Sequence, residues 1–172
     1  EVTLRTAAAL ESLRIMSSNP DLVVGAGTVI TADQVDSAIT AGARFIVSPG
    51  LSEEVIERAR HHGVPAIPGI ATATELIRAV ALGIDVVKFF PAVPIGGVPA
   101  IRALSSAFPG VRFVPTGGIS AQNASEFLAV DSVVAVGGSW MVPSRLISIG
   151  DFAGIQGLAR EAADLLASRM ST

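Results

Sequence analysis

The sequence has 172 residues, of which 50% are hydrophobic and 16% are charged, with a formal net charge of −3. This length supports one domain with a buried core, and the composition excludes a disordered or fibrous chain. The acidic balance, without any basic tract, argues against nucleic acid and anionic membrane as partners, and no apolar run reaches the roughly 18 residues of a membrane span. The lack of cysteine removes disulfides, thiolate nucleophiles and Cys-type zinc sites, and we expect a cytoplasmic protein.

Short runs rich in β-branched residues alternate with longer helix-like segments along the chain. Strands are expected at 1–5, 22–26, 44–48, 65–69, 85–90, 112–116 and 132–137. Helices are expected between and after them, at 6–18, 31–41, 52–62, 72–82, 97–107, 120–129 and 151–168. This alternation predicts parallel strands joined by crossover helices.

Several of the expected helices carry signals at their ends. Hydroxyl side chains that can cap a helix N-terminus precede three of them, at Thr31, Ser52 and Ser120. Glycines that can end a helix close three of them, at Gly42, Gly63 and Gly83.

Two architectures fit the alternation, an open doubly wound sheet and a (β/α)8 barrel. By the period of two, Glu1 and Arg5 share one face of the first strand, and Lys88 and Phe90 share one face of the strand at 85–90. A parallel sheet covered on both sides has nearly continuous apolar strands, whereas a barrel can turn polar residues into its lumen. We therefore predict an α/β TIM barrel in a single domain, 1–172. Seven strands are apparent instead of eight, so we expect the first β/α unit to be missing at the N-terminal end.

Lys88 is the only lysine among twelve basic side chains, and it lies in the apolar strand "DVVKFF". One interpretation is a snorkelling lysine whose ammonium reaches solvent. The other is a buried amine, because desolvation favours the neutral form and lowers the lysine pKa. A neutral amine can attack a ketone and form a Schiff base, and the protonated imine then allows a neighbouring C–C bond to break or form.

Such chemistry needs a group that moves protons, and the chain has no tyrosine. His61 and His62 lie at a predicted helix end, where solvated imidazoles favour the helix dipole and adjacent spacing makes a poor metal site. Glu1 is the one acid on an inward strand face, and a poorly hydrated setting would suit it to proton transfer; an exposed chain end is the alternative. Arg5, on the same face, offers a planar fork for a carboxylate or a salt bridge at the barrel mouth.

Glycine-rich turns follow the last two expected strands, in "PTGGIS" (115–120) and "VGGSW" (136–140). Backbone N–H groups in such turns can bind an anion, and the helix expected at 120 would add the positive end of its dipole. In barrels, the loops after strands 7 and 8 form the usual phosphate site. The stretch "VGAGTV" (24–29) lacks the third glycine of a dinucleotide fingerprint, so we expect its small residues to leave room for a ligand beside the Thr28 hydroxyl.

Eight segments taken together resemble one family along essentially the whole chain: "EVTLRT", "VGAGTV", "SPGL", "PGIATATE", "VKFFPA", "GGVPAIRAL", "PTGGIS" and "GGSWMVP". They are similar to the class I aldolases for 2-keto-3-deoxy-6-phosphogluconate (KDPG), which are often bifunctional with 4-hydroxy-2-oxoglutarate. The resemblance implies a homotrimeric barrel without metal or organic cofactor that acts on a phosphorylated keto acid and pyruvate.

The resemblance also implies residue roles. Lys88 would form the Schiff base and Glu1 would be the general acid/base. Arg5 and Thr28 would hold the pyruvyl carboxylate, and the pocket around the imine would be lined by Pro49 and Phe90. The phosphate would be surrounded by Thr116, Gly117, Gly118, Gly138 and Ser139.

The leading hypothesis is therefore cleavage of KDPG to pyruvate and D-glyceraldehyde 3-phosphate. Aldolases for the galactonate-derived epimer or for 4-hydroxy-2-oxoglutarate share the imine chemistry and would differ in their contacts with hydroxyls and phosphate. A non-catalytic trimeric scaffold or truncated barrel, and a phosphate-binding barrel with other chemistry, remain as alternatives of a different class.

Overall fold

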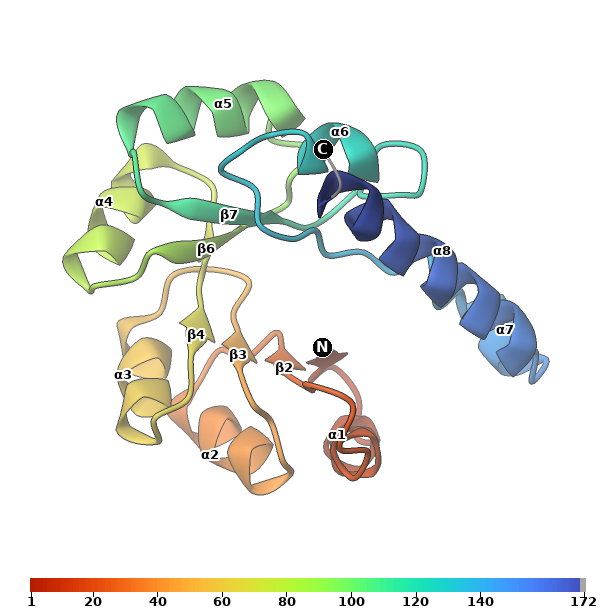
Figure 1. The fold of residues 1–172 in the computed structure, drawn as a ribbon. Coiled ribbons are helices and arrows are strands. Elements are labelled where there is room, and N and C mark those ends of the chain that lie inside the picture. Colours follow the sequence, from red (N-terminus) through yellow and green to blue (C-terminus); the bar gives the residue numbers. More distant parts are fainter. Residues whose placement is uncertain (171–172) are drawn as a thin grey trace. The chain divides into compact units, whose positions relative to one another are not determined.

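The computed structural model describes residues 1–170 and forms two compact units, Glu1–Lys88 and Phe89–Thr172 (Figure 1). The first contains nine complete elements: β1 (Val2–Thr3), α1 (Ala9–Ser17), β2 (Ala26–Gly27), α2 (Ala32–Thr40), β3 (Ile46–Val47), α3 (Glu53–His61), β4 (Ala66–Ile67), β5 (Gly69–Ile70) and α4 (Ala73–Ala81). Strand β6 (Val86–Phe89) contains the boundary, and the second unit continues with α5 (Gly97–Ala107), β7 (Arg112–Pro115), α6 (Ala124–Leu128), α7 (Ser144–Ser148) and α8 (Phe152–Met170).

The first unit is built on a parallel sheet in the order β1-β2-β3-β4. Val2, Ala26, Ile46 and Ala66 lie in register across it. The predicted parallel pairing is confirmed, but the strands are two residues long where five were expected. Proline is one reason: β4 ends at Ile67, because the next residue, Pro68, has no N–H to donate, and a new strand begins at Gly69.

Three helices cover this sheet with their apolar sides. The buried core combines Ala26 and Ile46 of the strands, and Val24 just before β2, with residues of the helices. Those helix residues are Leu13 of α1, Val35 and Ala38 of α2, and Val55 and Ala59 of α3. Burying such apolar side chains contributes the main stabilising term of the unit.

The second unit places the rings of Phe89 and Phe113 edge to face, with centroids 6.5 Å apart. The prediction of a strand at 132–137 is wrong, because this segment makes only isolated parallel bridges, Phe113↔Val133 and Thr116↔Gly137. The N–H of Phe113 donates to the Ser132 carbonyl at 2.8 Å. In a parallel pair, every second residue of a strand donates its N–H to the neighbouring strand. After Phe113 the next donor would be Pro115, which has no N–H.

The helix signals are confirmed in part. Thr31 and Ser52 cap α2 and α3 by accepting hydrogen bonds from the N–H groups of Gln34 and Val55. Gly42, Gly63 and Gly83 follow the helix ends with left-handed φ angles of 102°, 68° and 74°.

Ser120 does not cap a helix, because α6 begins only at Ala124 with Asn123 as its N-cap residue. The Asn123 side chain accepts from the N–H of Ser120 and donates to the Gly118 carbonyl. These bonds hold residues 118–123 as a turn. The helix α7 was not expected at all, and no helix within residues 1–170 is long and apolar enough to cross a membrane.

The start of α4 carries a reciprocal capping box. The Thr72 hydroxyl accepts from the Glu75 N–H, and the Glu75 carboxylate accepts from the N–H groups of Ala71 and Thr72, at 2.8 and 2.9 Å. Burial acts to raise the pKa of Glu75, but hydrogen bonds from Ala71 and from the Thr72 hydroxyl and N–H outweigh it and lower this pKa. A carboxyl group with a lowered pKa stabilises the fold above its unfolded-state pKa, and this stabilisation is lost as pH falls through the folded-state pKa.

We predict that Glu75→Gln lowers the free energy of unfolding by about 1 kcal/mol at pH 7. The difference from the wild type should shrink as pH falls through the lowered Glu75 pKa, in urea denaturation at a series of pH values. Glu54→Gln, at an exposed position in the first turn of α3, is the control and should change stability by no more than about 0.5 kcal/mol. A Glu75→Gln deficit that stays constant into strong acid would contradict the role of the ionised carboxylate.

Candidate active site

Lys88 lies within β6, and its residue surface is only 5% exposed. Its backbone N–H donates to the Pro68 carbonyl at 2.8 Å, which ties β6 to the residue before β5. Val87, before it, and Phe89, after it, are buried in the apolar core. The low exposure of the residue favours the buried amine over the snorkelling interpretation.

The electrostatic setting of Lys88 comes from three sources. Desolvation by burial is the largest and lowers the pKa of Lys88 below its ordinary value. The Glu1 carboxylate raises this pKa and the Arg5 guanidinium lowers it, with a net lowering. Glu1, Arg5 and Lys88 thus lie within electrostatic reach of one another in the first unit.

Glu1 and Arg5 flank β1, the edge strand of the four-stranded sheet. Both residues are exposed, and the poorly hydrated setting expected for Glu1 is not seen among the residues that the structure describes. The Glu1 carboxylate lies over Gly27 of β2. The space that we expected "VGAGTV" to leave for a ligand is, at Gly27, occupied by a side chain of the protein.

Thr28 and Pro49 each follow a strand of the same sheet. Thr28 comes directly after β2, is half-buried and has a left-handed φ of 59°, which β-branched residues rarely adopt. Pro49, also half-buried, packs its backbone against Gly69 of β5: a Cβ on Gly69 would overlap the Pro49 carbonyl group and lie 2.6 Å from the Gly50 nitrogen. Glycine at position 69 therefore allows two stretches of backbone to touch.

In the second unit, backbone hydrogen bonds between Thr116 and residues on either side of Phe90 bring Phe90 and Thr116 close together. The Thr116 N–H donates to the Phe89 carbonyl at 3.0 Å, and the Ala92 N–H donates to the Thr116 carbonyl at 2.8 Å. Gly117 has a φ of 98°, and a Cβ there would lie 3.3 Å from the Phe90 ring. These contacts bring Phe90, Thr116 and Gly117 together.

Gly118, Gly138 and Ser139 are exposed. Thr116 and Gly137 form a parallel bridge, which places the two glycine turns beside each other in this unit. The helix dipole expected at Ser120 is not available, because α6 starts four residues later and is five residues long. Backbone N–H groups and hydroxyls are what these turns can offer an anion.

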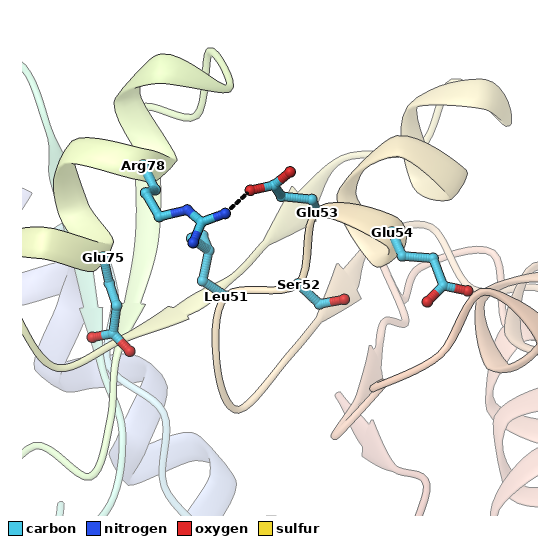
Figure 2. Close-up of a pocket in the computed structure, with 6 residues that line it drawn as sticks. All are labelled: Leu51, Ser52, Glu53, Glu54, Glu75 and Arg78. Carbon is cyan, nitrogen blue, oxygen red and sulfur yellow. Dashed lines mark hydrogen bonds and ion pairs between the residues drawn. The ribbon is translucent and has the colours of Figure 1, made fainter.

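A hollow of about 480 Å³ lies between the starts of α3 and α4 and contains none of the predicted site residues (Figure 2). Its lining residues are Leu51, Ser52, Glu53, Glu54, Glu75 and Arg78. The Arg78 guanidinium is paired with Glu53, and Glu75 caps α4. Three carboxylates and an already paired guanidinium would repel an anionic substrate.

The two histidines are exposed at the C-terminal end of α3, as predicted. The Nε2 atom of His62 lies 2.7 Å from Asp36 Oδ1 on α2. Over residues 1–170, no three side chains among His, Asp and Glu are grouped so that they could hold a metal ion.

A parallel α/β fold with a buried lysine beside a carboxylate and a guanidinium defines a candidate Schiff-base enzyme. The family model for "KDPG and KHG aldolase" matches residues 1–158 of the chain. The chain belongs to this aldolase family, in which KHG stands for 4-hydroxy-2-oxoglutarate. The prediction of an aldolase is thereby confirmed.

Individual relatives agree with this assignment. The 2-dehydro-3-deoxy-phosphogluconate aldolase of Treponema pallidum is 49% identical over 94% of this chain and 77% of the relative. The KDPG aldolase of Zymomonas mobilis, solved with 3-phosphoglycerate, has a TM-score of 0.87 and 46% identity, over 94% of this chain and 76% of that one. The KDPG aldolase of Legionella pneumophila, solved with pyruvate as a covalent carbinolamine, has a TM-score of 0.89 and 41% identity, over 94% of this chain and 79% of that one. The predicted barrel class is confirmed by these structures.

We predict opposite shifts of the Lys88 pKa when its two charged neighbours are neutralised. Glu1→Gln removes the charge that raises the pKa, so the pKa should fall further. Arg5→Gln removes the charge that lowers it, so the pKa should rise. Because Lys88 is the only lysine, NMR titration of protein labelled with 15N-lysine follows one side-chain amine.

The control for this titration is Arg14→Gln, which removes the guanidinium of the exposed Arg14–Glu11 ion pair on α1. It should leave the Lys88 midpoint where it is. Equal shifts in all three variants, or shifts of the same sign for Glu1 and Arg5, would contradict the electrostatic arrangement.

Proposed function

We propose that this protein is a class I aldolase that cleaves KDPG to pyruvate and D-glyceraldehyde 3-phosphate through a Schiff base on Lys88. The observation that carries the proposal is the buried Lys88 side chain, whose pKa is lowered chiefly by desolvation. A larger neutral fraction of the amine is what attack on a ketone requires. The covalent carbinolamine of the L. pneumophila relative supports the same type of chemistry.

The proposed reaction begins when the lone pair of Lys88 Nζ attacks the C2 ketone. The C=O π electrons move to oxygen, which takes a proton and gives a carbinolamine. Loss of water then leaves a protonated imine. Removal of the C4 hydroxyl proton breaks the C3–C4 bond, whose electrons flow to the imine nitrogen, and D-glyceraldehyde 3-phosphate leaves. Protonation of the enamine carbon and hydrolysis of the imine release pyruvate and restore the amine.

These steps need a group that accepts and returns protons, and we assign this role to Glu1. Its electrostatic reach to Lys88 supports the assignment. Arg5, exposed two residues after the end of β1, and the hydroxyl of Thr28 would hold the pyruvyl carboxylate, because a guanidinium matches that group geometrically. Pro49 and Phe90 would wall the imine. The protonated imine serves as the electron sink, so the proposed steps use no metal or organic cofactor.

The substrate phosphate would bind at the two glycine turns. Thr116 and Gly137 are bridged, and the left-handed Gly117 and Gly118, with φ of 98° and 79°, shape the first turn. Backbone N–H groups in turns of this kind form concave anion sites. The residues proposed to surround the phosphate are Thr116, Gly117, Gly118, Gly138 and Ser139. The 3-phosphoglycerate in the Z. mobilis structure supports a phosphorylated three-carbon fragment as ligand in the family.

A second substrate is 4-hydroxy-2-oxoglutarate, which would give pyruvate and glyoxylate. The family description, which includes KHG aldolase, favours it. It would use the same lysine and acid but no phosphate contact. Comparing kcat/KM for this substrate, KDPG and the galactonate epimer would rank the three.

We also propose a cytoplasmic homotrimer. Exposed apolar side chains such as Ile147, Ile149 and Phe152, with exposures of 50%, 62% and 68%, support burial against another copy. Sedimentation equilibrium would measure the subunit number, and a monomer at micromolar concentration would exclude the trimer.

Trapping with borohydride tests the Schiff base. With pyruvate present, hydride should add to the imine carbon and leave a stable secondary amine, located at Lys88 by peptide mass spectrometry. Lys88→Arg should form no side-chain adduct and should lose roughly a thousandfold or more in kcat, because a guanidinium cannot form the imine. Turnover that survives Lys88→Arg, or an intact wild type that yields no adduct, would exclude the proposed mechanism.

The phosphate site is tested by Ser139→Ala, which removes an exposed hydroxyl. Loss of one hydrogen bond to a charged group should raise KM for KDPG roughly tenfold, while kcat/KM for 4-hydroxy-2-oxoglutarate should stay within about twofold. Steady-state assays that couple pyruvate to lactate dehydrogenase measure both substrates. Equal losses on the two substrates would place Ser139 outside the phosphate site.

A further inference from the structure

The proposed reaction gives no role to Gly27, which contacts Glu1. The inference drawn from this contact rests on the proposed function. Gly27 lies in β2, is buried, and pairs with Thr3 of β1 in the parallel register. The carboxylate of Glu1 covers the position where a side chain on Gly27 would begin. An ideal Cβ there would overlap the Glu1 Oε1 atom and lie 2.7 Å from its carboxyl carbon.

Glycine at this position is not required by the backbone. Gly27 does not have the left-handed φ that makes glycine necessary in turns, whereas its neighbour Thr28 does adopt that conformation. Its hydrogen atom therefore serves to leave space. The atoms that use this space belong to the far end of a flexible side chain, so an added methyl group would displace the carboxylate and leave the backbone of β2 in place.

Displacing the carboxylate matters because Glu1 is the residue proposed to transfer protons at Lys88, whose pKa its charge influences. A misplacement of about 1 Å can cost a hundredfold in rate when a group must meet a reacting atom.

We infer that Gly27 is a positioning residue: the absence of a side chain at Gly27 seats the Glu1 carboxylate at the place from which it transfers protons for the imine on Lys88. Any side chain at position 27 pushes the carboxylate away and slows proton transfer without unfolding the sheet.

Gly25 provides a matched control two residues earlier in the same chain segment. It is also buried and also lacks a left-handed φ, but a Cβ on Gly25 would overlap the ring of Phe45 instead of a carboxylate. Gly25→Ala therefore disturbs packing near the sheet and leaves Glu1 alone.

The experiment is a double-mutant cycle on the full chain with Gly27→Ala and Glu1→Asp. Gly27→Ala alone should lower kcat for KDPG by roughly 10- to 100-fold, with the thermal midpoint unchanged within about 2 °C. Aspartate places its carboxyl carbon where glutamate has Cγ, which lies 3.3 Å from the ideal Cβ of residue 27. The loss of kcat caused by Glu1→Asp should therefore be at least about threefold smaller in the Gly27→Ala background than in the wild type.

A pH profile separates positioning from a general loss of structure. The limb of the kcat profile that disappears in Glu1→Gln should move in Gly27→Ala. In Gly25→Ala the same limb should stay in place, while the thermal midpoint falls. Independent effects of Gly27→Ala and Glu1→Asp, together with an unmoved limb, would overturn the positioning role.

The two proposals fail in different ways. If the wild type neither traps pyruvate on Lys88 nor cleaves KDPG, the proposed function fails. If the wild type does both and the cycle is additive, only the role of Gly27 fails.

Discussion

Burial of the Lys88 amine in β6 is the constraint on which the rest of the arrangement depends. A lysine that is 5% exposed would hold a desolvated ammonium at a high free-energy cost, and the lowered pKa of Lys88 reflects that cost. The chain keeps the residue in place by pairing its backbone with Pro68 and packing Val87 in the core. The strand thus fixes the backbone of Lys88, while the charges of Glu1 and Arg5 act on the Lys88 side chain.

Glycine and proline determine how closely the elements around this lysine approach. Gly69 lets the Pro49 backbone touch β5, and Gly27 lets the Glu1 carboxylate lie on β2. Pro68 and Pro115 interrupt strand ladders because neither can donate an N–H. Proline thus limits the length of β4 and the pairing of β7 with residues 132–137.

The alternation of strands and helices was enough to predict the parallel fold, and the apolar strand around the only lysine was enough to single out Lys88. Neither pattern could predict the contact between Glu1 and Gly27, because that contact depends on the register between two strands joined by a helix. The start of α6 was misplaced for a different reason: Ser120 and Asn123 are both good capping residues. The Asn123 side chain accepts from the Ser120 N–H and donates to the Gly118 carbonyl, so these residues form a turn before the helix begins.

The buried position of the only lysine also determines the reactivity of the protein surface. All other basic side chains apart from the two histidines are arginines, whose guanidinium groups do not form stable imines with simple aldehydes. An enzyme that releases an aldehyde into its own surroundings is exposed to glycation wherever it displays lysine. This chain displays its cations as arginine, so its side chains confine aldehyde chemistry to the one amine that can use it.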